Sequence, residues 1–323
     1  MAIRTALTER FGLEYPIVLA PMGTVAGGKL AAAVSNAGAL GLVGGAYGDP
    51  EWLERELALV QTGTDRPWGV GLITWYATHE VVDLILRYRP SAFLLSFGDV
   101  RPYAETIKAA GCTLLCQVQE VETARKAVTA GADLVVAQGS EAGGHSGIRS
   151  TLPLVPAVVD AVAPVPVLAA GGIADGRGLA AVLMLGAQGA MLGTRFSAAS
   201  ESLTHERARE RIVAARAADT ARSRVVDIVR DYAWPAPYAG SARGIRNRFL
   251  TQWHGREDEL EAALETEAPT YRQAVVEGDV DTAVVLAGEA VDLIDAVVPA
   301  GELVQRIGAE AEARLQVGPA MLP

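Results

Sequence analysis

One histidine lies in a glycine-containing stretch where a proton acceptor could operate. Residues 137–147 read AQGSEAGGHSG, which places His145 directly after Gly143 and Gly144. A histidine side chain titrates near about pH 6.5, which suits a general base, and glycines allow the close approach of a flat ligand. A lone histidine can also be structural, but its position between glycines favours catalysis. We therefore predict that His145 is a catalytic base, with Glu141 either orienting it or solvated.

Two further glycine-rich stretches could bind an anion. They read AAGGIADGRG (169–178) and GAMLGTRF (189–196). Glycines let backbone N–H groups approach a phosphate, and parallel barrels commonly bind phosphate in the loops after their seventh and eighth strands. The two stretches predict a phosphate site. The alternative, that these glycines only form tight turns, stays open.

The elements that must position these residues follow a regular alternation. Ala-rich segments with helical spacing separate short apolar runs, a pattern typical of a parallel sheet covered by helices. Eight such units predict an α/β protein with a (β/α)₈ barrel, whose active site lies at the carboxyl ends of the strands. A doubly wound open sheet is the alternative. The apolar runs are 16–22, 40–46, 68–75, 92–98, 113–118, 134–139, 165–172 and 189–196.

The alternation stops near residue 200. Residues 201–216 are expected to form the eighth barrel helix, and 298–315 a closing amphipathic helix. Residues 217–295 fit no strand–helix unit. We predict a barrel domain from 1–216 and 296–323, with 217–295 as a small helical insertion that could cover the barrel mouth.

Composition narrows the partners of the protein. The 323 residues are 50% hydrophobic, carry a net charge of −10 and contain no Lys/Arg-rich run, which argues against nucleic acid or a membrane surface. Two cysteines provide no disulfide framework or metal site. We see no signal peptide and no uninterrupted apolar stretch of membrane-spanning length. The expected location is the cytoplasm.

Five motifs together resemble the nitronate monooxygenase family, formerly called 2-nitropropane dioxygenases. The resemblance extends over about residues 8–200, and ARGIRNRFL (242–250) is similar to the C-terminal part of the family. It implies a TIM barrel that binds FMN without a covalent link. The motifs are PIVLAPM (16–22), AAAVSNAGALGLVGG (31–45), AQGSEAGGH (137–145), AAGGIADGRG (169–178) and GAQGAMLGTRF (186–196).

The resemblance also implies roles for particular residues. His145 matches the histidine regarded as the catalytic base, and Met22 would contact the flavin ring. Many members have Asn where this chain has Gly71, so one side-chain contact to the flavin is in doubt. The full set of expected cofactor-binding residues is Met22, Gly71, Gln138, Gly143, Gly144, Gly171, Gly172, Met191, Leu192, Gly193 and Thr194, of which Gly172 and Met191 to Thr194 would hold the phosphate.

The implied activity is the oxidation of alkyl nitronates or nitroalkanes by O₂ to a carbonyl compound and nitrite, with FMN as cofactor. A homodimer is compatible with the sequence. Three alternatives stay open: an FMN-dependent enoyl-acyl-carrier-protein reductase or a similar NAD(P)H-using enzyme, a flavin-binding protein without turnover, and a barrel for phosphorylated metabolites without flavin. Loop residues decide the substrate, and the fold does not.

Overall fold

The core of the molecule is a parallel barrel. The computed structural model describes residues 3–317. Each predicted apolar run contains one strand, and nearly every strand residue is buried, as expected for a sheet covered on both faces. The strands are β1 (Ile17–Leu19), β2 (Gly41–Ala46), β3 (Trp68–Ile73), β4 (Ala92–Ser96), β5 (Thr113–Val118), β6 (Leu134–Gln138), β7 (Val167–Ala170) and β8 (Ala190–Leu192).

The strand order shows that the sheet closes on itself. Neighbours follow the order β1-β8-β7-β6-β5-β4-β3-β2, and every pair is parallel. The remaining gap, between β1 and β2, is bridged where Leu40 donates to the carbonyl of Ile17 and accepts from the amide of Leu19. The predicted (β/α)₈ barrel is therefore confirmed, and the open-sheet alternative is excluded.

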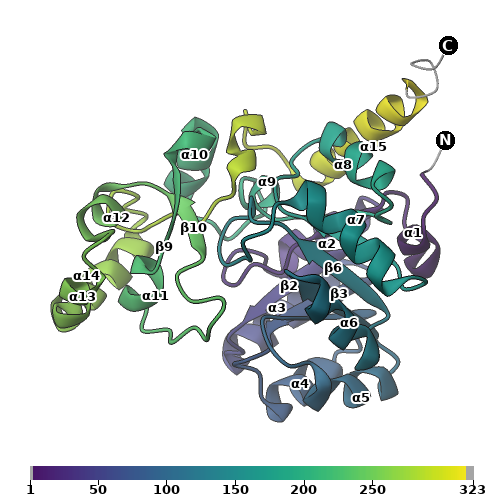
Figure 1. Ribbon diagram of the computed structural model, residues 1–323, viewed down its shortest axis with the longest axis horizontal. Coiled ribbons are helices and arrows are strands. Elements are labelled where there is room, and N and C mark those ends of the chain that lie inside the picture. Colours follow the sequence, from purple (N-terminus) through teal and green to yellow (C-terminus); the bar gives the residue numbers. More distant parts are fainter. Residues whose placement is uncertain (1–2, 318–323) are drawn as a thin grey trace.

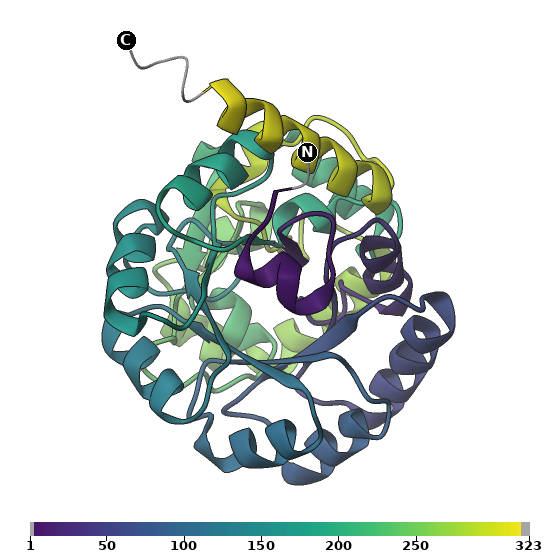
Figure 2. The same cartoon turned by 90° about the vertical axis from the view of Figure 1, so that its right-hand side faces the viewer.

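The barrel interior is filled and covered at its N-terminal end. Aliphatic side chains from alternate strand positions, such as Leu42 and Leu94, form one interior cluster. Helix α1 (Ala6–Phe11) adds Leu7 and Phe11 to that cluster and lies across the barrel end that faces the viewer in Figure 2. The interior is thus a packed core, and only the opposite end is left for a ligand.

Helices surround the strands in a ring. They pack on the outer face of the sheet through a second, larger cluster of buried aliphatic side chains. At least 15 residues separate successive strands, enough for one covering helix each. Helix α1 is not part of this ring. The first seven helices of the ring are α2 (Gly28–Asn36), α3 (Pro50–Gly63), α4 (His79–Leu86), α5 (Arg101–Ala109), α6 (Val121–Thr129), α7 (Thr151–Val162) and α8 (Gly176–Met184).

The sequence suggested that residues 201–216 form the eighth helix of the ring, but they do not take this place. That stretch contains α10 (Glu206–Ala214), which follows the short α9 (Thr194–Ser197) and buries only Ile212. Helix α15 (Ala300–Val317) instead lies between α8 and α2 and completes the ring (Figures 1 and 2). The reason is the larger apolar face of α15, which buries Leu303, Val304 and Ile307 among others.

Most elements of residues 217–295, called the lobe below, lie to one side of the barrel (Figure 1). The lobe has a hydrophobic cluster of its own that includes Val225, Phe249 and Tyr271. Besides the expected helices, it contains a two-stranded antiparallel sheet. Its elements are η1 (Ala217–Asp219), β9 (Thr220–Ser223), α11 (Val225–Val229), β10 (Ala242–Ile245), α12 (Arg248–Trp253), α13 (Glu257–Ala262), α14 (Leu264–Glu277) and η2 (Glu289–Leu293).

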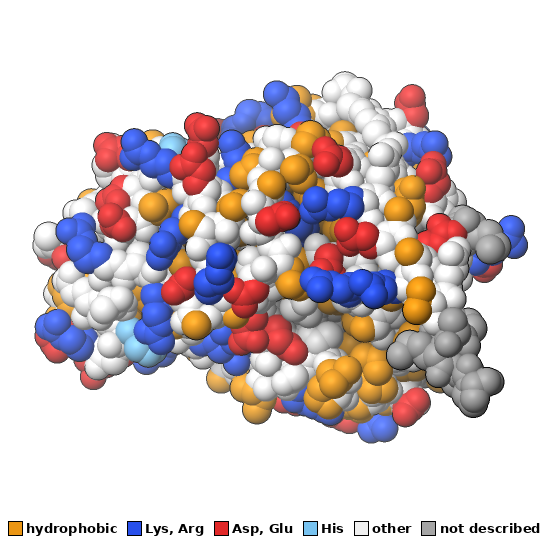
Figure 3. Space-filling view, turned by 90° about the horizontal axis from the view of Figure 1, so that it is seen from above, with side chains coloured by type: hydrophobic (Ala, Val, Ile, Leu, Met, Phe, Trp, Pro, Cys, Tyr) orange, Lys and Arg blue, Asp and Glu red, His pale blue; other side chains and the backbone are white. Residues whose placement is uncertain are grey.

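The surface carries charges of both signs. On the face in Figure 3, basic and acidic side chains are interspersed over barrel and lobe. Among residues 3–317, no helix combines the length and the apolar character needed to cross a lipid bilayer.

Candidate active site

A cavity of about 250 Å³ opens between the carboxyl ends of the strands and the lobe. Its walls come from the loops after the barrel strands on one side and from the lobe on the other. The lobe residues that line it are Val226, Asp227, Arg230, Tyr232, Trp234, Leu286, Gly288 and Ala290. A parallel barrel brings the ends of all its strands to one edge, so residues distant in sequence meet there.

Eleven of the twelve residues expected at the site line this one cavity. The exception is Leu192, whose side chain is 1% exposed and belongs to the outer core between strands and helices. In a strand, neighbouring side chains point to opposite faces, so Leu192 faces away from the cavity while Met191 faces it. The lining residues are Met22, Gly71, Gln138, Gly143, Gly144, His145, Gly171, Gly172, Met191, Gly193 and Thr194.

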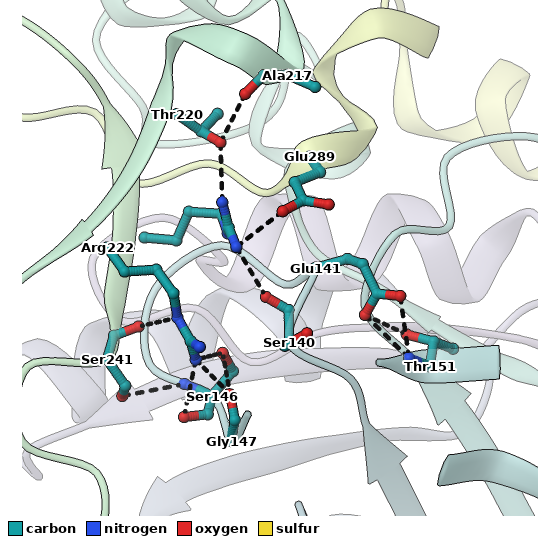
Figure 4. A network of polar contacts seen from close by, with 11 residues as sticks. Ser140, Glu141, Ser146, Gly147, Thr151, Ala217, Thr220, Arg222, Ser241 and Glu289 are labelled. Atoms are coloured by element: carbon teal, nitrogen blue, oxygen red, sulfur yellow. Dashed lines mark hydrogen bonds and ion pairs between the residues drawn. The ribbon is translucent and has the colours of Figure 1, made fainter. Parts of the chain in front are cut away.

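The loop after β6 is held by the lobe. Gly144 pairs with Arg243 of β10 through two backbone hydrogen bonds of 3.0 and 2.9 Å. The Arg243 guanidinium forms an ion pair with Glu289 at 2.8 Å and donates to the carbonyl of Ser140. Figure 4 shows Glu289 and Ser140 on this side of the loop and Arg222 on the other. Arg222 of β9 donates to Ser146 and to the carbonyl of Gly147. The glycine-rich loop is therefore bound on both sides of the histidine.

Gln138 positions the backbone of the histidine. Its Nε2 donates to the carbonyl of His145 at 3.1 Å, and its Oε1 accepts from Nε2 of Gln119 at 2.9 Å. Both ends of this buried amide are thus engaged within the protein. Gln138 lines the cavity, as expected for a flavin contact, but its hydrogen bonds support the catalytic loop.

His145 is paired with an acid from the lobe. Its Nε2 lies 2.8 Å from Oδ1 of Asp227, and the two side chains are only 9% and 10% exposed. The indole of Trp234 stacks on the imidazole with ring centroids 3.4 Å apart and planes 12° apart. Glu141, which the sequence suggested as an orienting residue, instead accepts from the backbone and hydroxyl of Thr151. The acid that contacts the imidazole is therefore Asp227.

An aromatic wall lies beside the histidine. Tyr47, which follows β2, stacks on Tyr232 of the lobe at 3.8 Å and accepts a hydrogen bond from Nε1 of Trp234 at 3.1 Å. Phe97, which follows β4, meets the edge of Trp234. Burial raises the pKa values of Tyr47 and Tyr232 above the usual range, so both hydroxyls stay neutral. The wall is apolar and uncharged.

The opposite side of the cavity has the shape of a backbone cradle. Gly171 and Gly172 both have left-handed backbones, with φ of 95° and 75°, and a Cβ on Gly171 would meet the carbonyl of Gly139 at 2.8 Å. Thr194, after β8, accepts from the amide of Gly288 at 3.0 Å. A surface of glycine backbone and one threonine hydroxyl at the ends of β7 and β8 fits a phosphorylated flavin, because phosphate groups bind backbone N–H groups and hydroxyls.

The position of Gly71 has a structural explanation. A Cβ at this residue would lie 2.2 Å from Cγ of Pro21. The ring of Pro21 therefore takes the space that any side chain at position 71 would need. The cavity wall at this point is apolar.

Several lining residues were not anticipated, and five of them form the aromatic wall or contact His145. Tyr47 and Phe97 directly follow strands β2 and β4, so inspection of every strand end could have found them. Asp227, Tyr232 and Trp234 come from the lobe, whose sequence has no repeating pattern to indicate which side chains face the cavity.

The chain is similar to known proteins over almost its whole length. A family model described as nitronate monooxygenase matches residues 4–79 and 73–310. A nitronate monooxygenase from Neurospora crassa is 35% identical over 93% of this chain and 90% of its own length. A (3aS,4S,5R,7aS)-5-hydroxy-7a-methyl-1-oxo-octahydro-1H-indene-4-carboxyl-CoA dehydrogenase from Rhodococcus jostii is 33% identical over 97% of both chains. The solved structure of FabK from Thermotoga maritima superposes with a TM-score of 0.89 and 32% identity, over 99% of this chain and all of that one.

The chain belongs to the nitronate monooxygenase family. It is an enzyme, a flavin-type oxidoreductase of that family, and its relatives carry more than one activity in their names.

Proposed function

We propose that this enzyme oxidises alkyl nitronates or nitroalkanes with O₂, forming a carbonyl compound and nitrite, and that FMN is its cofactor. The observation that carries the proposal is the buried His145 in the same cavity as the glycine cradle of Gly171 and Gly172. A base for the Cα proton and a cradle for the flavin phosphate in one cavity support the oxidation of a neutral nitroalkane.

The residues of the chain would divide the work as follows. Gly172, Gly193 and Thr194 would hold the flavin phosphate, and Met22 would lie against the ring system. His145 would accept the Cα proton of a neutral nitroalkane, or hydrogen-bond to a nitronate that is already formed. A bound flavin supplies the redox chemistry, while the protein supplies position and a proton acceptor.

The aromatic wall suits the alkyl part of such a substrate. Phe97 and Trp234 present apolar surface beside His145 and keep water from the base. A nitro group is compact and polar, so the wall would face the carbon chain and the base the acidic carbon.

The test combines a spectrum with one variant. The purified protein should show the visible absorption of oxidised flavin, and a nitronate added in air should release nitrite. A base contributes about 10²–10⁴-fold, so His145→Asn should keep the flavin and lose nitroalkane turnover by about that factor. Undiminished turnover in this flavin-loaded variant would show that His145 is not the base.

A second candidate function is a reaction with NAD(P)H, as in a flavin-dependent enoyl reductase or a similar oxidoreductase. It is supported by the superposition on FabK and by the dehydrogenase name of the Rhodococcus jostii relative, both over almost the whole chain. Anaerobic mixing with NADH or NADPH separates the two functions. Rapid bleaching of the flavin would favour the NAD(P)H-dependent reaction, and slow bleaching together with nitrite release would favour nitronate oxidation.

A further inference from the structure

We propose that Asp227 is a positioning residue that fixes the tautomer of His145, so that Nδ1 is the atom that takes the substrate proton. This inference rests on the proposed role of His145 as the base. It adds a lobe residue to a site whose expected members all come from the barrel.

The hydrogen-bond chemistry of the pair sets the tautomer. An ionised carboxylate only accepts hydrogen bonds, so the 2.8 Å contact requires Nε2 of His145 to carry the proton. A neutral imidazole has one N–H and one lone pair, and the lone pair is then on Nδ1. The contact with Asp227 thus leaves Nδ1 as the basic atom.

Three contacts together restrain the imidazole. Gln138 holds the His145 carbonyl, Trp234 sets the plane of the ring by stacking at 3.4 Å, and Asp227 sets its rotation. Because the ring is held in plane and in rotation, the direction of the Nδ1 lone pair is also set. A base held in a productive direction needs no reorientation when a substrate binds.

The carboxylate itself is held by the lobe core. Asp227 lies on α11, whose Val225, Val226 and Val229 are buried against α13 and α14. The second carboxylate oxygen, Oδ2, is buried and has no hydrogen-bond partner in residues 3–317. An unpartnered buried acceptor is unfavourable for stability, and such groups are retained where they serve the site.

The experiment compares two substrates in one variant. A neutral nitroalkane must lose a proton before it is oxidised, whereas a preformed nitronate has already lost it. In Asp227→Asn, kcat for the nitroalkane should fall about 10²-fold or more, because the amide no longer enforces a lone pair on Nδ1. KM and the turnover of the nitronate should change by only a few-fold. The matched control is Asp231→Asn, which removes one charge at an exposed position of the same segment and should behave as the wild type.

A spectroscopic measurement tests the pair without turnover. In protein with ¹⁵N-labelled histidine, the wild type should show a Nε2–H resonance protected from solvent exchange that is absent from His145→Asn and lost or moved in Asp227→Asn. Equal losses of kcat for both substrates, or an unchanged resonance in Asp227→Asn, would overturn the proposal. If the wild type oxidises neither substrate, the proposed function fails, and the resonance alone decides whether Asp227 sets the tautomer.

Discussion

At the scale of the residue, burial alone can dominate the chemistry of a side chain. Cys112 directly precedes β5 and Cys116 lies on it, and both are free thiols. Burial raises the pKa of Cys112 to about 11 and that of Cys116 to about 12. A thiol is reactive as the thiolate, so we expect neither cysteine to take part in redox chemistry at neutral pH.

These thiols predict a dependence of stability on alkaline pH. Between the ordinary thiol pKa of 9.0 and the raised values, the folded chain keeps protons that the unfolded chain has lost. The free energy of unfolding should therefore be unaffected by the thiols below about pH 9 and fall above it, by at most about 1.4 kcal/mol per pH unit for each thiol. Urea unfolding of the wild type and of Cys116→Ala at pH 7 to 10.5 checks this. The variant should lose less stability over that range, and equal losses would contradict the prediction.

At the scale of the element, the contact between the β6 loop and the lobe depends on one small residue. A Cβ on Gly143 would lie 2.6 Å from the backbone carbon of Ala287 and 2.7 Å from the amide nitrogen of Gly288. Backbone atoms cannot yield as a flexible side chain can. The neighbouring Gly144 has open space around it but a left-handed backbone, with φ of 66°.

The two glycines can therefore be separated by substitution. Gly143→Ala should separate the loop from the lobe, lower the free energy of unfolding by about 1–3 kcal/mol and weaken flavin binding. Gly144→Asn should cost much less, because Asn tolerates the left-handed conformation. Thermal unfolding and flavin titration of both variants measure the effects. Equal stability of the two variants would show that the close approach at Gly143 is not limiting.

At the scale of the whole molecule, barrel and lobe meet around the cavity. The cavity is lined from both sides, by Gly172 and Thr194 of the barrel and by Asp227 and Trp234 of the lobe. A ligand that binds there contacts both parts and stabilises only the folded state. Ligand at about 100 times its Kd adds about 2.7 kcal/mol to the free energy of unfolding.

This linkage predicts that FMN and riboflavin stabilise the protein unequally. FMN should raise the Tm of the flavin-free protein by several degrees, and riboflavin, which has no phosphate, should raise it less at the same concentration. Thermal shift assays with both ligands provide the measurement. The variant Thr194→Val should reduce the difference between them. Equal shifts for both ligands in the wild type would place the phosphate away from β7 and β8.

Much of the barrel was predictable because its elements have local signatures. Each buried strand is a short apolar run, and each covering helix repeats apolar residues at helical spacing. Position in the chain could not predict that α15 rather than α10 is the eighth helix of the ring. That depended on which helix has the larger apolar face, and α15 buries several aliphatic residues where α10 buries only Ile212.

The sequence alone determined which residues line the side of the cavity that is built from the strand ends. His145, Gly171, Gly172 and Thr194 follow strands, and a parallel barrel necessarily brings such residues to one edge. Only the tertiary structure decided that Asp227 rather than Glu141 contacts the histidine. The reason is physical: residues 217–295 carry no repeat, and their path over the barrel mouth depends on the packing of the lobe core and on the hydrogen bonds of Arg222 and Arg243, which join positions far apart in the chain.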